Sequence, residues 1–466
     1  MRRLHLELAL AALALGLVSG CGQVIGLEDK PCQPGCTPGG EKLVCENGVP
    51  KTESCASTER CAAGECIAPV ISALNCNACA TDADGALWCW GAHFDGQLGS
   101  MELENYGAPV RVPLPDKVRE VSVGTLHVCA VTDSHDLYCW GDNSKGQSDG
   151  GKASSPRVEP TRVLGDVDHV SAGLAHTCAL SHGRVYCWGS NGAGQCGKRL
   201  EPPPALIPGP DLRCEFDDAV LAELGEAVQL PAVDVQQVVV QKHTTCALAE
   251  SGKVYCWGAN CGGNYKGDDC STGGQLGVAP ATLCYSDQPR EVHGYLKGIG
   301  LGHLSGFAFD VENRLSAWGW GQEQLGVGEI TKEFVPALTP VVNADGEQLA
   351  GVNQIVRSNG WHAFAHTASG FFSWGENTCG ELGRTGAAPG EKVLFPSAAR
   401  ADWVPPDVDR LATGQDFTCY LDADNQVYCF GNHRFLGQTL GAPPICVDEA
   451  AKNCGSPTEK VLVKLE

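Results

Sequence analysis

The amino-acid sequence predicts an all-β fold made of seven similar units. Three observations support this: a motif that recurs seven times, a hairpin pattern inside each copy, and no sustained apolar period of 3.6 residues in the repeat region. In the motif, an apolar residue and two further residues, the second often Cys, precede an aromatic residue and Gly. An element that recurs in this way marks one supersecondary unit repeated along the chain. The aromatic positions are Trp90, Trp140, Trp188, Trp257, Trp318, Trp374 and Phe430.

Each copy reads as a β-hairpin followed by a loop. In the third copy, an apolar strand at 176–180 is followed by a short turn, the strand 185–189 and the Gly-rich loop 191–195. Small sheets of this kind bury their faces only against their neighbours, and a closed ring leaves no open sheet edges. Seven copies therefore favour a seven-bladed β-propeller over the alternative, a linear β-solenoid, whose repeats are shorter. If the ring closes, we expect the C-terminal strand at 460–465 to pair with a blade near the start of the chain.

The repeat resembles that of the regulator of chromosome condensation family. The residues that carry this resemblance are Gly173-x-x-His176-Thr177 before the hairpin turn and Trp188-Gly189 after it, together with the Gly-Gln-Leu-Gly loops at 96–99 and 274–277. The resemblance extends over residues 70–466. It implies a seven-bladed β-propeller, in agreement with the number of motifs.

The cysteines indicate an oxidising compartment, because 26 Cys in 466 residues are too many for a reducing one unless they bind metal. In five copies one Cys lies on each strand of the hairpin, 9 or 10 residues apart, and the other two copies lack both members. Presence and absence in pairs is what a cross-strand disulfide predicts. Buried free thiols are the alternative. The expected hairpin disulfides are Cys79–Cys89, Cys129–Cys139, Cys178–Cys187, Cys246–Cys256 and Cys419–Cys429.

Further disulfides are expected in the loops. Cys261–Cys270 and Cys446–Cys454 each bracket a short excursion, and Cys196 with Cys214 is a candidate bridge across the third insertion. With Cys21 set aside, an odd number of cysteines remains, so at least one is unpaired within the chain. Zinc is not expected, because the single Cys76-x-x-Cys79 has no second Cys-x-x-Cys at a suitable spacing.

The N-terminus indicates export. Residues 1–20 have a basic start and an apolar run of about eleven residues, too short to span a bilayer, which is typical of a signal peptide. The segment 18–21 resembles the lipobox of bacterial lipoproteins, with Cys21 as the lipidated residue, and cleavage without lipid is the alternative. Gly22 is not acidic, as in proteins sorted to the outer membrane. Residues 21–69 read as a spacer with six cysteines in three bridges of open connectivity, and residues 70–466 as the propeller.

The charge and the motifs exclude several functions. A formal net charge of −22 disfavours nucleic acid, and contact with the membrane is expected only through the lipid. No motif of a hydrolase, a nucleotide site or a metal centre is present, so we predict no catalytic residue, cofactor or metal. The exchange-factor activity of some family members would need a cytoplasmic GTPase. Three histidines in one register are expected to bond to the next blade: His127, His176 and His362.

We therefore expect an exported, monomeric binding module at the cell envelope, an outer-membrane lipoprotein facing the periplasm or the surface, with a protein or glycan partner. The alternatives are an extracellular hydrolase or lyase in the central funnel and a passive scaffold. Binding is expected where copies depart from the repeat: 199–235, 260–283, 330–349 and 433–457. Three tryptophans outside the repeated position are candidates for an exposed contact surface: Trp320, Trp361 and Trp403.

Overall fold

In the computed structural model, the described part of the chain consists of strands, turns and loops and contains no helix. Accordingly, no helix in this part is long and apolar enough to cross a membrane. The structure describes residues 34–46, 49–56, 59–100, 108–200, 206–207, 213–214, 219–231, 234–261, 273–279, 282–320, 325–329, 334–356, 360–384, 393–432 and 460–465.

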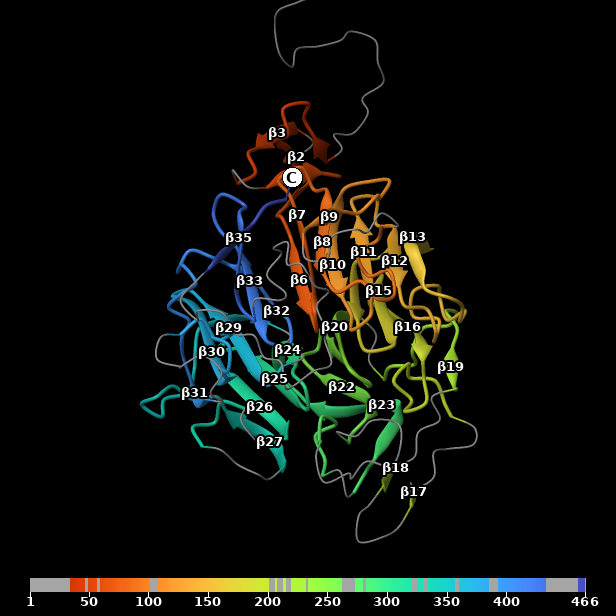
Figure 1. The fold of residues 1–466 in the computed structure, drawn as a ribbon, viewed down its shortest axis with the longest axis vertical. Coiled ribbons are helices and arrows are strands. Elements are labelled where there is room, and N and C mark those ends of the chain that lie inside the picture. The colour runs from red at the N-terminus through yellow and green to blue at the C-terminus, as the bar shows by residue number, and fades with distance from the viewer. Residues whose placement is uncertain are drawn as a thin grey trace, which may run out of the picture.

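Seven four-stranded antiparallel sheets surround a common centre, as predicted for a seven-bladed β-propeller (Figure 1). We number these sheets blades 1 to 7. From inner to outer strand, blade 1 consists of β6 (Ile71–Leu74), β7 (Asn77–Thr81), β8 (Leu87–Gly91) and β9 (Val110–Arg111), and blade 2 of β10 (Val118–Val123), β11 (His127–Thr132), β12 (Leu137–Gly141) and β13 (Arg157–Leu164). Blade 3 consists of β14 (His169–Ala172), β15 (His176–Ser181), β16 (Arg184–Ser190) and β19 (Leu221–Ala222), and blade 4 of β20 (Val235–Gln241), β21 (Thr244–Ala249), β22 (Val254–Ala259) and β23 (Tyr285–His293). Blade 5 consists of β24 (Leu296–Leu301), β25 (Ser305–Asp310), β26 (Leu315–Trp320) and β27 (Phe334–Pro340), and blade 6 of β28 (Val352–Val356), β29 (His362–Thr367), β30 (Gly370–Glu376) and β31 (Leu394–Arg400). Blade 7 consists of β32 (Arg410–Thr413), β33 (Phe417–Leu421), β34 (Val427–Gly431) and β35 (Val461–Val463).

The repeated Trp-Gly motif ends the third strand of each blade, and its two residues have different tasks. The indole is buried between blades: Trp140, Trp188, Trp257 and Trp318 each donate their Nε1 hydrogen to the backbone carbonyl of a Gln in the preceding blade, at 2.9–3.0 Å. The glycine has a positive φ, +98° at Gly141, and a Cβ there would lie 2.6 Å from the carbonyl oxygen of Leu126. A larger residue is therefore excluded by backbone contact.

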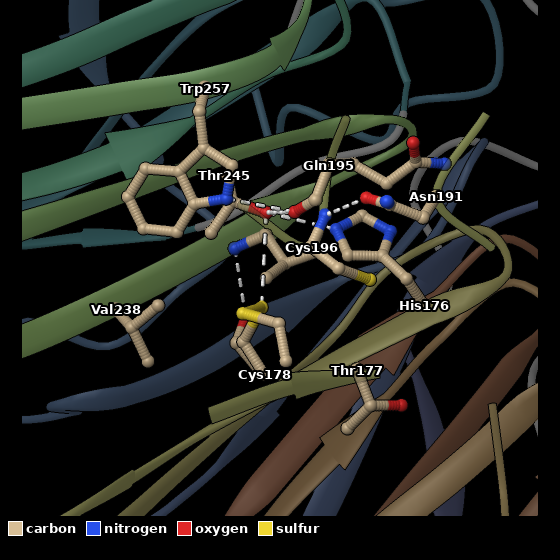
Figure 2. Close-up of a disulfide and its surroundings, with 12 residues drawn as sticks. His176, Thr177, Cys178, Asn191, Gln195, Cys196, Val238, Thr245 and Trp257 are labelled. Atoms are coloured by element: carbon tan, nitrogen blue, oxygen red, sulfur yellow. Dashed lines mark hydrogen bonds between the residues drawn. A yellow bond between two sulfur atoms is a disulfide. The ribbon is translucent and has the colours of Figure 1, made fainter. Parts of the chain in front are cut away.

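The joint between blades 3 and 4 shows this arrangement in full (Figure 2). The carbonyl oxygen of Gln195 accepts hydrogen bonds from the indole of Trp257 and from the hydroxyl of Thr245, at 2.9 and 2.8 Å. Cys196, which follows, donates its backbone N–H to the side-chain oxygen of Asn191 at 3.0 Å. The loop after each Trp-Gly therefore holds the next blade through its backbone.

The ring closes by packing of blade 7 against blade 1, and the prediction for the C-terminal strand is wrong. β35 pairs with β34, with Val461 opposite Cys429, so it is the outer strand of blade 7 and not a strand of a blade near the chain's start. A buried cluster joins the two blades and includes Trp90, Phe417 and Val461. The backbone N–H of Gln415 also donates to the carbonyl of Asn75 at 2.8 Å, as Thr125 donates to Gly173 between blades 2 and 3.

Five hairpins contain a buried disulfide between directly opposed residues of their second and third strands, with Cα atoms 4.1 Å apart in each. They join Cys79–Cys89, Cys129–Cys139, Cys178–Cys187, Cys246–Cys256 and Cys419–Cys429. In blades 5 and 6 the same register opposes Phe307 to Ala317 and Phe364 to Ser373.

The remaining cysteines divide into three groups. Cys196 is a buried free thiol, so the candidate bridge to Cys214 is not formed; burial also raises the pKa of its thiol far above the ordinary value. Cys45, Cys76, Cys284 and Cys379 take part in disulfides. Cys261 is buried in the described part, but its expected partner Cys270 lies outside it, as do both members of the expected pair Cys446–Cys454 and the lipidation residue Cys21.

The N-terminal segment forms two small sheets joined by disulfides. Its strands are β1 (Gly35–Cys36), β2 (Lys42–Glu46), β3 (Val49–Glu53), β4 (Arg60–Ala62) and β5 (Glu65–Ile67). Cys36–Cys61 and Cys55–Cys66 are two of its bridges, which settles part of the connectivity that the sequence leaves open. We call residues 34–67 the N-terminal knot. It lies beside blade 1 at the top of Figure 1.

The N-terminal knot is fastened to blade 2 by charged groups. The guanidinium of Arg60 forms an ion pair with Asp133 and donates a hydrogen bond to the carbonyl of Val118 at 2.7 Å. The side chains of this pair are only 14% and 13% exposed, and a second ion pair joins Arg119 of the blade to Glu65. The knot is thus attached to the ring directly.

Candidate functional site

The two faces of the ring are built from different turns. Each inner strand is joined to the second strand by a turn on one face, such as 124–126 in blade 2, and the loops after the Trp-Gly motif emerge on this same face. We call it the mouth face. Arg60 contacts Val118 and Asp133, which lie at the ends of β10 and β11 that are farther from the mouth face. The N-terminal knot therefore occupies the face away from the mouth.

The departures from the repeat that the structure describes lie on the mouth face, with one exception. The insertion 199–235 leaves blade 3 after β16 and returns through β19, and it contains the short hairpin of β17 (Leu206–Ile207) and β18 (Arg213–Cys214). The described parts of the loop 260–283 follow β22 in the same way, and the segment 433–457 lies outside the described residues. The stretch 330–349, in contrast, contains the outer strand β27 of blade 5 and the turn at 341–349, which follows the other end of that strand.

The inner strands enclose a central cavity of about 290 Å³. Its serines are used to tie the blades together: Ser72, Ser122 and Ser171 each accept the backbone N–H of a residue in the next blade, at 3.0–3.1 Å. One charged pair lies among them, with Nδ1 of His169 2.6 Å from a carboxylate oxygen of Glu120. Nε2 of His169 faces the carbonyl of Val238 at 2.8 Å, so both ring nitrogens are engaged and neither is available as a base.

Three unlike side chains meet on the mouth face, where blades 4, 5 and 6 lie next to one another. Lys242 and His303 occupy equivalent positions in the turns of blades 4 and 5, and Nζ of Lys242 lies 2.5 Å from Nε2 of His303. The imidazole of His303 stacks on the indole of Trp361 in blade 6, with ring centres 4.5 Å apart and planes 16° from parallel. We call these residues the mouth cluster. All three are partly exposed.

The lysine of the mouth cluster is a cation without a carboxylate partner. No Asp or Glu in the described part of the chain lies within ion-pair distance of Lys242, although the whole chain has a net charge of −22. Burial lowers the pKa of Lys242 to about 8, because desolvation disfavours the ammonium form. The neighbouring His243 is buried, and burial lowers its pKa to about 3, so it is neutral and adds no charge.

Of the three histidines in one register, two bond to the next blade as predicted, and the bond expected for His362 is not formed in the described part. His127 and His176 bond through Nε2 to the hydroxyls of Thr177 and Thr245 in the following blades, at 2.9 and 3.0 Å. His362 is buried, and its Nε2 has no partner among the described residues. Burial lowers the pKa of His362 to about 4. The three imidazoles are buried between blades, so they do not form a ring of ligands.

Of the three candidate tryptophans, one is buried and two are partly exposed. Trp320 is only 9% exposed, so the expectation of an exposed surface is wrong for it, whereas Trp403 is partly buried and packs edge-on against Phe430 beside the core of blades 6 and 7. Trp361 lies in the mouth cluster. Its two partners were not predicted, because Lys242 and His303 are 61 residues apart and belong to no shared motif. Their common turn position was the available signal.

Within the described residues, one group of possible metal ligands comes together: Cys55, Glu59 and Cys66. Cys55 and Cys66 are joined in a disulfide, so neither offers a thiolate. This group therefore does not have the donors of a metal centre.

The fold and the mouth cluster define a closed β-propeller with one differentiated face. Models of the regulator of chromosome condensation (RCC1) repeat match residues 84–131, 118–147, 167–195, 242–264 and 408–436. The chain therefore carries repeats that resemble those of the RCC1 family.

Curated relatives share part of the chain. It is 26% identical over 276 residues to the ultraviolet-B receptor UVR8 of Arabidopsis thaliana, covering 57% of this chain and 56% of that protein. It is 29% identical over 200 residues to protein pim1 of Schizosaccharomyces pombe, covering 41% of this chain and 34% of pim1. The matched region is thus less than two thirds of the length of either relative.

Solved structures agree with the fold. Yeast RCC1 (Prp20), in its complex with Kap60, superposes with a TM-score of 0.57 at 20% identity, over 74% of this chain and 78% of that one. Human WBSCR16 superposes with a TM-score of 0.56 at 18% identity, over 76% and 91% of the two chains. At these identities the likeness concerns the propeller architecture.

Proposed function

We propose that this chain is an exported binding module, held at the outer membrane by a lipid on Cys21, which binds a protein partner with its mouth face. The observation that carries the proposal is the difference between the two faces. The mouth face combines a partly exposed cation–aromatic cluster with the insertions of blades 3 and 4, whereas the other face holds the N-terminal knot. Repeat folds place insertions on one face, often the binding face.

Export is supported by the cysteines. Seven disulfides between described residues, five in the blades and two in the knot, would not persist in a reducing compartment. The attachment of the knot supports an orientation as well. Because the knot follows the proposed anchor and contacts the face opposite the mouth, the mouth would point away from the membrane.

A protein partner is supported by the family. The structures of Prp20 describe a complex with Kap60 and binding to Gsp1p and histones. A net charge of −22 argues against nucleic acid for this chain. An enzyme in the central funnel has little support, because the serines of the channel and His169 are already engaged.

A capture experiment tests the proposal. The processed, oxidised chain serves as bait against envelope extract, and bound proteins are identified by mass spectrometry. Two variants shorten the mouth loops, by removing 201–218 or 262–272, and both retain the outer strand β19 and the third strand β22. We expect a reproducible partner that at least one deletion abolishes. A partner that both variants retain, or no partner, would contradict binding by the mouth face.

The anchor is tested separately. Replacement of Cys21 by Ser is expected to abolish incorporation of labelled fatty acid and to release the protein from the membrane fraction. Incorporation of label by Cys21→Ser would contradict lipidation at this residue.

A further inference from the structure

The mouth cluster contains an ammonium group, that of Lys242, with no carboxylate beside it in the described part of the chain. A partly buried ammonium normally has a carboxylate beside it, because the interaction compensates for lost hydration. Lys242 has instead a hydrogen bond to an imidazole, and no described carboxylate lies within 4.0 Å of it. The equivalent turn positions of the other blades contain no Lys, Arg, Asp or Glu: they are Asn75, Thr125, Leu174, His303, Gly360 and Gln415.

The cluster has the donors that a single carboxylate needs. The ammonium of Lys242 has three N–H donors and gives one of them to Nε2 of His303, 2.5 Å away, so the other two can be donated to a carboxylate. The imidazole is held in place by its stack on Trp361, which leaves apolar surface beside the donors. The backbone at Lys242 is fixed too, because its φ is +46° and its carbonyl accepts the N–H of Leu174.

We propose that the mouth cluster is a binding pocket for one carboxylate of a polypeptide, a chain terminus or an acidic side chain next to an apolar group. This inference rests on the proposed function and names the chemistry of its partner. The net charge of the chain favours a partner that offers a single carboxylate over a polyanionic partner. A chain of net charge −22 repels a strongly acidic segment at long range. A local cation beside an aromatic surface can still bind one carboxylate at short range.

The pH dependence of binding follows from the groups around Lys242. Its pKa is lowered to about 8, so the ammonium is present at neutral pH and is lost above it. His303 packs against it from blade 5, and His243, neutral because burial lowers its pKa to about 3, adjoins it in blade 4. Affinity for the carboxylate should therefore fall about tenfold for each pH unit above 8, since each unit removes nine tenths of the ammonium.

The test uses N-acetylphenylalanine as a probe and its neutral amide as a control, titrated calorimetrically into the oxidised full chain. We expect saturable binding of the acid, at least tenfold weaker binding of the amide, and at least tenfold weaker binding of the acid to Lys242→Gln. The control variant is Lys253→Gln, which removes an exposed lysine paired with Glu291 at the other end of blade 4 and should bind like the native chain. A thermal melt of each variant confirms that it is folded.

The outcomes separate this inference from the proposed function. Equal binding of acid and amide, or undiminished binding by folded Lys242→Gln, would overturn the carboxylate pocket. Tighter binding of glucuronate than of N-acetylphenylalanine would overturn the assignment to a polypeptide. If a captured partner is lost on shortening the mouth loops but is retained by Lys242→Gln, the proposed function stands and this inference fails. If the probe binds but no partner is captured, the reverse holds.

Discussion

Five hairpins of the ring are joined by a disulfide and two are not, yet all seven have the same register. Cys129 opposes Cys139 in blade 2, and Phe307 opposes Ala317 in blade 5 with the same pairing of second and third strands. Phe307 and Phe364 are fully buried and fill the volume with one large side chain opposite a small one. In blade 6 the small residue, Ser373, also donates its hydroxyl hydrogen to the carbonyl of Leu382 at 2.8 Å.

This difference shows that the disulfide is one of two ways to complete the same core position. A bridge stabilises mainly by restricting the unfolded chain, whereas a buried phenylalanine acts through packing. Only the first depends on the redox state. The hairpins of blades 5 and 6 should therefore be insensitive to reductant, and among the hairpins the other five should give the response.

The largest effect is expected from complete reduction. Each lost bridge costs about 2–4 kcal/mol, so five together approach or exceed the about 5–15 kcal/mol by which a domain is usually stable. We expect the chain to unfold at room temperature or at a much lower urea concentration in dithiothreitol, measured by circular dichroism. An unchanged urea midpoint, with thiol titration showing full reduction, would contradict the role given to the five bridges.

Removing a single bridge is the next largest change. Cys246→Ala/Cys256→Ala in blade 4 should lower the free energy of unfolding by about 2–4 kcal/mol, because both residues are buried and their loop is constrained. Urea denaturation measures it. The matched variant is Cys196→Ala, which removes a buried thiol of blade 3 that is in no disulfide and should cost less. Equal losses would mean that the cysteines act mainly by packing.

Blade 6 also differs from other blades in having a titratable residue, Glu381, in the loop after its third strand. Glu381 stands where other blades have Gln97, Gln147, Gln195 and Gln275, and burial raises its pKa to about 8 from 4.5. Between pH 4.5 and about pH 8, the carboxyl group of Glu381 is therefore still protonated in the native state but already ionised in the unfolded state. Its contribution to stability is fully present below pH 4.5 and is lost as the pH rises through 8.

Glu381→Gln should remove this dependence. The two oxygens of Glu381 accept the N–H groups of Thr378 and Cys379, and the amide oxygen of Gln keeps one of these two hydrogen bonds. We expect the variant to be about 2 kcal/mol more stable than the native chain at pH 9, with a smaller difference near pH 5. Urea midpoints at the two pH values provide the measurement, and a constant difference would rule out the titration of Glu381.

The smallest effect on stability is expected at the N-terminal knot. Arg60→Met breaks a largely buried ion pair with Asp133 and should weaken the attachment by about 1 kcal/mol or somewhat more. Limited proteolysis should then cut between the knot and blade 1 faster, with little change in the melting temperature of the ring. Lys51→Met, which breaks the exposed pair with Glu46, is the control and should leave the cleavage rate unchanged.

The repeat could be predicted in detail because its signals are local. The spacing of Trp-Gly predicts the number of blades, and the paired presence of Cys178 and Cys187 identifies opposed positions of one hairpin. The bond from His176 to the next blade was also predictable, because the residue recurs in register. Which tryptophans are exposed was harder to predict, because the position of Trp320 outside the motif gives no information about its burial.

By itself the sequence determined the seven-fold architecture, the class of the fold and the opposed cysteines, because periodicity and pairing are written within each unit of the chain. Only the tertiary structure decided that β35 completes blade 7, that Arg60 fastens the knot to blade 2, and that Lys242 meets His303. These contacts join residues from different units or from far along the chain. They arise only when the ring closes and places neighbouring turns at one mouth, and no local pattern encodes that geometry.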